Sequence, residues 1–175
     1  MPSVSSYISS HNITTLTKSR PNAPNPMCNC NNADSCPLDG ECQVSAVVYQ
    51  GTIEIPNGEK RNYIGLAEPV FKGRWLDHMT SCNDRQYEKK TKLSQEFWNI
   101  RDSGQNVNRY ENIKFSIKKK SHPYRAGGRK CDLYLWEKLL IMQNEKVVIN
   151  KRDEFMSKCL HRNIFKLRNH KTRNR

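Results

Sequence analysis

The chain has 175 residues, of which 35% are hydrophobic, and its 30 lysines and arginines against 17 acidic residues give a formal net charge of +13. This length fits one domain of ordinary size with tails, and no run of about 18 apolar residues is present to span a membrane. The charge favours a polyanionic partner, nucleic acid before an anionic membrane surface. A basic soluble domain without such a partner is the alternative.

Residues 1–26 are rich in serine, threonine, asparagine and proline. Such a segment buries too little apolar surface to offset its ordering entropy, so we predict a disordered linker. It also lacks the apolar core of a secretory signal. We therefore expect an intracellular, reducing location, nuclear or cytoplasmic, where clustered cysteines bind metal more often than they form disulfides.

Residues 27–43 form a cysteine-rich lead-in, with the four thiols of Cys28, Cys30, Cys36 and Cys42 separated by asparagine, aspartate, proline and glycine. Turn-forming residues between thiolates let a short loop wrap a tetrahedral ion, and such a loop has no apolar core to hold it otherwise. The spacing predicts a structural Zn²⁺ site. Free or incidental cysteines are the alternative.

Three further residues are candidate ligands of the same or a second ion: Cys131, Cys159 and His161. His161 follows Cys159 by two positions, so a site could draw ligands from both ends of the chain. Cys82 is isolated in a predicted helix, which indicates a buried thiol.

The segment after the lead-in predicts a β-hairpin followed by a helix. We expect a strand ending near Tyr49, a turn at residues 56–58 and a second strand through residues 63–65, because β-formers flank an Asn-Gly pair. The helix after Pro69 places Arg74 and His78 four residues apart on one face.

Residues 93–101 predict an amphipathic helix with Ser94 as a possible cap, and residues 110–117 predict a third strand. A lysine run and a glycine-containing basic loop follow. They are either solvated surface or phosphate contacts, and the DNA-binding candidates are Lys118, Lys119, Lys120, Arg125, Arg129 and Lys130.

Asp132 can cap a helix over residues 132–145, in which Glu137 borders a wide apolar face. A short apolar run then ends at Asn150, and residues 152–161 predict a last helix before a basic tail at 162–175. This order of elements predicts an α+β fold with a small, mainly antiparallel sheet flanked by helices.

These residues resemble the motifs of the GIY-YIG nuclease superfamily. Its two name-giving motifs correspond to Val47-Val48-Tyr49 and Tyr63-Ile64-Gly65, with Val47 in place of the first glycine. Arg74, His78, Glu137 and Asn150 follow in the family's order. The resemblance covers about residues 44–155, within a nuclease domain expected at 44–161. The cysteine-rich lead-in and the sequence KCDLYLWEKL resemble more narrowly the C-terminal endonuclease domains of retroelements of the Penelope-like type.

The resemblance implies a metal-dependent DNA endonuclease that nicks target DNA for retroelement integration, and that is part of, or derived from, a reverse transcriptase polyprotein. Glu137 can hold one Mg²⁺ or Mn²⁺, hard cations that prefer oxygen ligands and polarise a phosphate. Arg74 would clamp the scissile phosphate and steady its developing charge.

The resemblance also implies roles for two tyrosines, a histidine, a glycine and an asparagine. The resemblance implies Tyr49 as general base or water-orienting group, with Tyr63 and His78 hydrogen-bonding water or phosphate. Base catalysis by a tyrosine requires its pKa to be lowered from about 10. Gly65 would permit a close backbone approach, and Asn150 would orient Tyr49 or hold the geometry of the site.

Each of these residues also has an ordinary structural explanation, such as a sheet aromatic, a surface ion pair, a buried helix histidine or a helix-surface glutamate. The competing function is a catalytically inactive, zinc-containing nucleic-acid-binding module derived from a retroelement. A zinc-dependent protein-interaction adaptor is the third possibility, and the net charge disfavours it.

Overall fold

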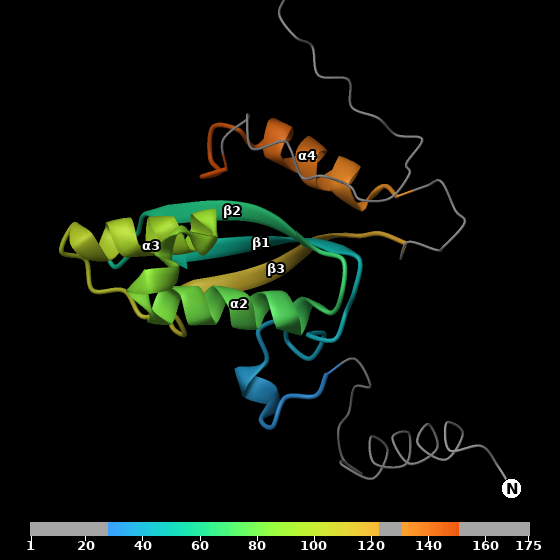
Figure 1. The fold of residues 1–175 in the computed structure, drawn as a ribbon, viewed down its shortest axis with the longest axis horizontal. Coiled ribbons are helices and arrows are strands. Elements are labelled where there is room, and N and C mark those ends of the chain that lie inside the picture. The colour runs from blue at the N-terminus through green and yellow to red at the C-terminus, as the bar shows by residue number, and fades with distance from the viewer. Residues whose placement is uncertain (1–27, 123–130, 151–175) are drawn as a thin grey trace, which may run out of the picture.

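The computed structural model describes residues 28–122 and 131–150 (Figure 1). The elements in chain order are the 3-10 helix η1 (Ala33–Ser35), β1 (Val47–Glu54), β2 (Lys60–Ala67), α2 (Phe71–Asn83), the 3-10 helix η2 (Arg85–Lys90), α3 (Lys92–Asp102), β3 (Ile113–Lys120) and α4 (Leu133–Gln143). The strands form one antiparallel sheet in the order β2-β1-β3. The predicted α+β class with a small antiparallel sheet is confirmed. No helix in the described part of the chain is long and apolar enough to cross a membrane.

Several expectations fall on residues outside the described ranges. These are the linker at 1–26, the helix at 152–161, the tail at 162–175, the candidate ligands Cys159 and His161, and the basic residues Arg125, Arg129 and Lys130.

The hairpin has its predicted turn, but the first strand lies later in the sequence than predicted. Gly58 has a φ of +88°, and the Ile55 amide donates to the Glu59 carbonyl at 2.9 Å. Ala46 has a φ of 51°, a left-handed conformation that a strand cannot contain. The strand therefore starts after Ala46, so Tyr49 lies near its beginning and not near its end.

One face of the sheet carries the main core. Val47, Tyr49 and Ile53 alternate along β1 and pack with residues of α2 and α3 such as Phe71 and Phe97. Figure 1 shows α2 running along this side of the sheet. Cys82 lies in the same core with 2% of its surface exposed, and burial raises the pKa of its thiol to about 12. The predicted buried thiol is confirmed.

The opposite face carries a second, smaller core beneath α4. Val48 of β1 and Ile64 of β2 pack there with Leu133 and Ile141 of α4. Figure 1 shows α4 on the side of the sheet opposite α2. The two helices that carry Arg74 and Glu137 thus cover different faces, with the sheet between them.

Helix caps differ from two predictions. Thr91, not Ser94, is the N-cap of α3: its side chain accepts the Ser94 amide, and Ser94 bonds back to the Thr91 amide as a capping box. Asp132 is at the N-cap of α4 but makes no capping bond. Its carboxylate instead accepts the Ser121 hydroxyl and the Trp136 indole N–H.

Strand β3 starts three residues later than predicted and continues through the lysine run. Hydrogen bonds between Asn108 and Asn112 hold residues 108–112, just before β3, in a turn that leaves Tyr110 exposed. The register with β1 shifts because Lys119 pairs with Val48 and Ile117 with Tyr49, so Lys118 is the extra residue of a β-bulge.

Candidate functional site

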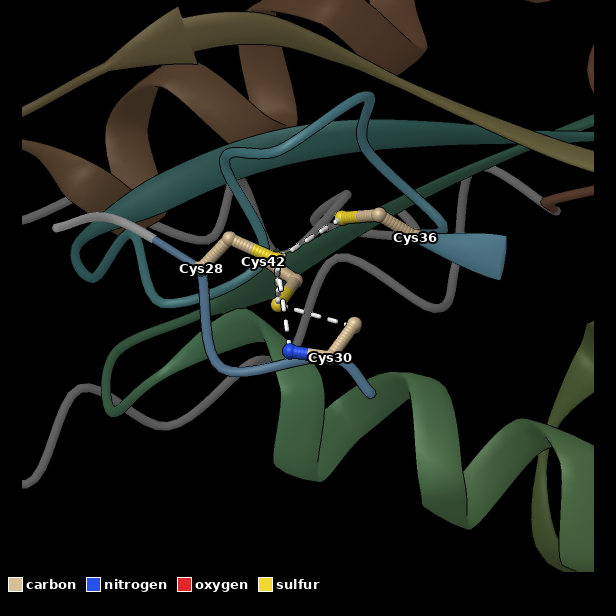
Figure 2. A group of neighbouring side chains, drawn as sticks. All are labelled: Cys28, Cys30, Cys36 and Cys42. Carbon is tan, nitrogen blue, oxygen red and sulfur yellow. Dashed lines mark hydrogen bonds between the residues drawn. The ribbon is translucent and has the colours of Figure 1, made fainter. Parts of the chain in front are cut away.

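Four sulfur atoms converge in the loop before β1. The Sγ atoms of Cys28, Cys30, Cys36 and Cys42 all lie within 4.8 Å of one another, and Figure 2 shows their side chains pointing toward a common centre. Three pairs are 3.6–3.7 Å apart. Four thiolates around Zn²⁺ at about 2.3 Å have edges of about 3.8 Å. The group could hold a metal ion such as zinc.

The backbone around these sulfurs already has the donors that a thiolate site requires. Burial raises the pKa of Cys30 to about 12. Burial acts the same way on Cys36, but the backbone amides of Leu38 and Gly40 donate to its sulfur and lower the pKa to about 7. The Cys30 amide donates to the Cys28 sulfur at 3.4 Å. N–H···S bonds of this kind stabilise the deprotonated thiols that bind metal.

Cys131 lies apart from this cluster. It is 4% exposed and packs in the second core with Val48 and Ile64. Within residues 28–122 and 131–150, the four lead-in cysteines are the group that gathers as a metal site. The lead-in site therefore does not draw on Cys131.

A second polar group lies where the Tyr49 side chain crosses β2. Tyr49 pairs with Gly65 across the hairpin, and a Cβ on Gly65 would lie 2.7 Å from Cζ and Oη of Tyr49 and from Cε1 of Tyr63. Gly65 is thus required for the approach of the two tyrosine rings. The sequence led us to expect a close approach of the backbone at this position, whereas the atoms that approach belong to side chains of the same sheet.

The Tyr49 hydroxyl is bound by His78 of α2. Its Oη lies 2.7 Å from His78 Nε2, and His78 Nδ1 lies 3.3 Å from the Thr91 hydroxyl. His78 is fully buried, and burial followed by the charge of Arg74 lowers its pKa to about 3. Both ring nitrogens have protein partners, so the expected contact of His78 with water or phosphate is corrected. The histidine orients Tyr49.

The pKa of Tyr49 argues against the role of general base. Burial, and next the neighbouring Tyr63, raise it well above its ordinary value, although Arg74 acts in the opposite direction. Burial and then Glu137 raise the pKa of Tyr63 to about 12. Both phenols therefore stay protonated near neutral pH. Of the two roles expected for Tyr49, the arrangement disfavours the general base.

Arg74 and Glu137 act on this pair of phenols from opposite helices. The positive charge of Arg74 lowers the pKa values of both tyrosines, while the Glu137 carboxylate raises both by its charge. Arg74 also pairs with Asp77 at 3.5 Å, and 34% of its side chain is exposed. Both charges thus affect the two tyrosines, although Glu137 follows Tyr49 by 88 positions in the chain.

Asn150 does not contact Tyr49 through its amide group. Its side chain accepts the Ile64 amide at 2.8 Å and donates to the Ile64 carbonyl at 2.9 Å. Val148 forms a parallel bridge with Asn62, and the Ile149 amide donates to the Asn62 carbonyl at 2.7 Å. The segment therefore pairs with the edge of β2 and fixes the backbone between Tyr63 and Gly65.

The lysine run has structural contacts in addition to charge. Lys119 and Lys120 alternate across the sheet, and the bulge decides which face each one meets. The Lys119 ammonium lies 4.3 Å from the centre of the Trp136 ring, and that of Lys120 lies 2.8 Å from a Glu41 carboxylate oxygen. Lys118, the bulge residue, is exposed. Two of the three lysines expected to contact phosphate thus tie β3 to α4 and to the cysteine loop.

Two residues near these groups were not singled out from the sequence. Thr91 contacts His78, and its capping box with Ser94 could have been found from the Thr-x-x-Ser spacing ahead of an apolar run. Lys72 places its ammonium 3.6 Å from the Cys30 sulfur. Nothing in the local sequence distinguishes Lys72 from other surface lysines.

No family model, curated protein or solved structure matches this chain.

The burial of His78 predicts that stability falls as the pH is lowered below about 6.5. Its folded-state pKa of about 3 is below the unfolded value of 6.5, so the unfolded chain binds the extra proton in this range. We expect the free energy of unfolding to decrease by about 1 kcal/mol per pH unit between about pH 6 and pH 4.5. Urea titrations at several pH values would measure it.

The matched variant is His78→Gln, which keeps a polar side chain but cannot titrate. It is expected to be less stable at pH 7 and to lose this slope. An identical slope in wild type and variant would assign the effect to other groups.

Proposed function

We propose that the chain is a metal-dependent DNA endonuclease of the GIY-YIG type that hydrolyses phosphodiester bonds and nicks target DNA for retroelement integration. The observation that carries the proposal is the buried cluster of Tyr49, Tyr63 and His78, in which the Tyr49 hydroxyl lies 2.7 Å from His78 Nε2 and the two tyrosine rings lie 6.3 Å apart. Arg74 and Glu137 both act on the pKa values of these tyrosines. These residues come from four separate elements, and a purely structural hairpin does not require them. Residues of these types match the needs of phosphodiester hydrolysis.

Each side chain has a defined task in this proposal. Arg74 is partly exposed and carries a fixed positive charge, so it can bind the scissile phosphate and stabilise charge that develops there. The Tyr49 hydroxyl, held by His78, and the Tyr63 hydroxyl orient water or phosphate oxygens by hydrogen bonds. Glu137 would hold Mg²⁺ or Mn²⁺, which supplies Lewis-acid polarisation of the phosphate when bound.

The DNA partner is supported by the net charge of +13, which is expected to make binding strongly salt-dependent. A nuclear or cytoplasmic location and an origin in a reverse transcriptase polyprotein belong to the same proposal. The four-cysteine loop would be the structural metal site of such an enzyme.

Replacement of Glu137 by alanine is expected to abolish the nicking of supercoiled plasmid by purified protein with Mg²⁺ or Mn²⁺. We expect a loss of at least roughly 10²-fold in rate with DNA binding retained, because the carboxylate is assigned to the metal and not to the backbone grip. Gel conversion of supercoiled to open circular DNA measures the rate, and fluorescence anisotropy measures binding.

Glu145→Ala is the matched control, since Glu145 is exposed just beyond α4. It should nick at the wild-type rate. Equal nicking by wild type and Glu137→Ala would contradict the assignment of Glu137.

A second function is supported by a specific observation. Tyr49 and His78 are fully buried and Tyr49 has a raised pKa, which is also compatible with an inactive nucleic-acid-binding module that has kept the fold. Wild-type protein that binds DNA but never nicks it with either metal would support this module and refute the endonuclease.

A further inference from the structure

The cysteine loop is joined to the first turn of α2 by backbone hydrogen bonds. The Phe71 amide donates to the Val44 carbonyl at 2.8 Å, and the Lys72 amide donates to the Cys42 carbonyl at 2.9 Å. The helix has no side-chain cap at Val70. The first amides of a helix have no partner within the helix, so here the loop that holds the cysteines satisfies them.

The Lys72 side chain joins the same two segments a second time. Its ammonium lies 2.6 Å from the Asn29 side-chain oxygen, 3.4 Å from the Asn29 carbonyl oxygen and 3.6 Å from the Cys30 sulfur. Asn29 stands between two of the cysteines. Lys72 therefore holds the beginning of the cysteine loop against α2, while the Cys42 carbonyl holds its end.

Charge explains why a cation belongs at this place. Four thiolates outweigh the two positive charges of Zn²⁺, so a loaded four-cysteine centre is anionic. An ammonium group in contact with a ligand sulfur offsets part of that charge. Partners of this kind outside the ligand set commonly change metal affinity by about 10- to 100-fold.

We propose that Lys72 strengthens metal binding through its contact with the Cys30 sulfur, and that the bound metal fixes the N-terminal turn of α2 through Lys72 and the Cys42 carbonyl. Arg74 lies two residues after Lys72 in the same helix. Lys72 is therefore a positioning residue for Arg74, and this consequence for DNA cleavage rests on the proposed endonuclease function. The effect on metal affinity does not depend on that function.

The first test measures zinc affinity of the full chain by competition with a chelator. Lys72→Met keeps most of the stem and removes the charge, and it is expected to weaken zinc binding by about 10- to 100-fold. Lys72→Arg should recover most of the affinity. Lys60→Met is the matched control, because Lys60 is exposed and pairs with Glu54 in the hairpin. Wild-type affinity in Lys72→Met would overturn the proposal.

The second test uses wild-type protein and so does not depend on the folding of a variant. Removal of zinc with a chelator is expected to speed hydrogen exchange at the Phe71 and Lys72 amides by roughly tenfold or more, with little change at the β1–β2 pairing. Unchanged exchange at these two amides would also overturn the proposal. Neither readout requires nicking, so the absence of nuclease activity alone would refute only the proposed function.

Discussion

Serine in place of Cys30 or Cys36 is expected to remove the metal ion and unfold the loop from Cys28 to Val44. The loop between η1 and β1 buries few large side chains, Leu38 and Val44 among them, so a bound ion would be its main source of order. Binding free energies of structural zinc sites are on the order of 10 kcal/mol, and replacing a thiolate by a hydroxyl loses most of this. Elemental analysis of zinc per chain and thermal unfolding would measure the effect.

Cys82→Ser is the matched control because Cys82 is buried in the main core, away from the four-cysteine group. It should retain zinc and lose about 1–2 kcal/mol of stability from the buried hydroxyl. Wild-type zinc content in both Cys30→Ser and Cys36→Ser would contradict the lead-in site.

Alanine in place of Gly65 is expected to have the second large effect, on both stability and activity. The added Cβ would meet two aromatic-ring carbons and the Tyr49 hydroxyl oxygen, each at 2.7 Å, and these atoms belong to buried tyrosines that have little room to move. Overpacking costs about 1–3 kcal/mol, and a displaced Tyr49 hydroxyl would leave the buried His78 without one partner, which costs a similar amount. If the Tyr49 hydroxyl moves by about 1 Å, nicking is expected to slow by about 10²-fold.

Gly73→Ala provides a matched comparison. Gly73 lies in α2, and nothing is within 4 Å of the position of its Cβ. Alanine is the better helix former, so this variant should gain about 0.5–1 kcal/mol. Urea denaturation compares the two. A Gly65→Ala protein as stable and as active as wild type would refute the role given to the tyrosine approach.

Local sequence signals predicted the elements well and their ends less well. The Asn-Gly turn and the alternation through Ile113, Phe115 and Ile117 indicated strands that the structure contains. The start of β1 depends on the left-handed Ala46, and the start of β3 depends on hydrogen bonds made by Asn112. Neither conformation is encoded by a strong local preference of the residue type.

The candidate site was predictable as a set of residues but not in its roles. A motif resemblance selected Tyr49, His78 and Asn150, yet their contacts depend on which strand or helix lies opposite. Asn150 bonds to a backbone 86 positions earlier in the chain, and the β-bulge decides that Lys119 meets Trp136 and that Lys120 meets Glu41. Register and packing of distant segments set these contacts.

The sequence by itself determined the cysteine group, the hairpin and the strong positive charge. Ligands within one short loop can meet without the rest of the fold, and turn and strand preferences act over a few residues. The tertiary structure decided that Tyr49 and His78 are buried, that their pKa values move away from neutrality, and that Lys72 meets the cysteine loop. The side chains lose their contact with water, and distant segments meet, only when helices cover both faces of the sheet.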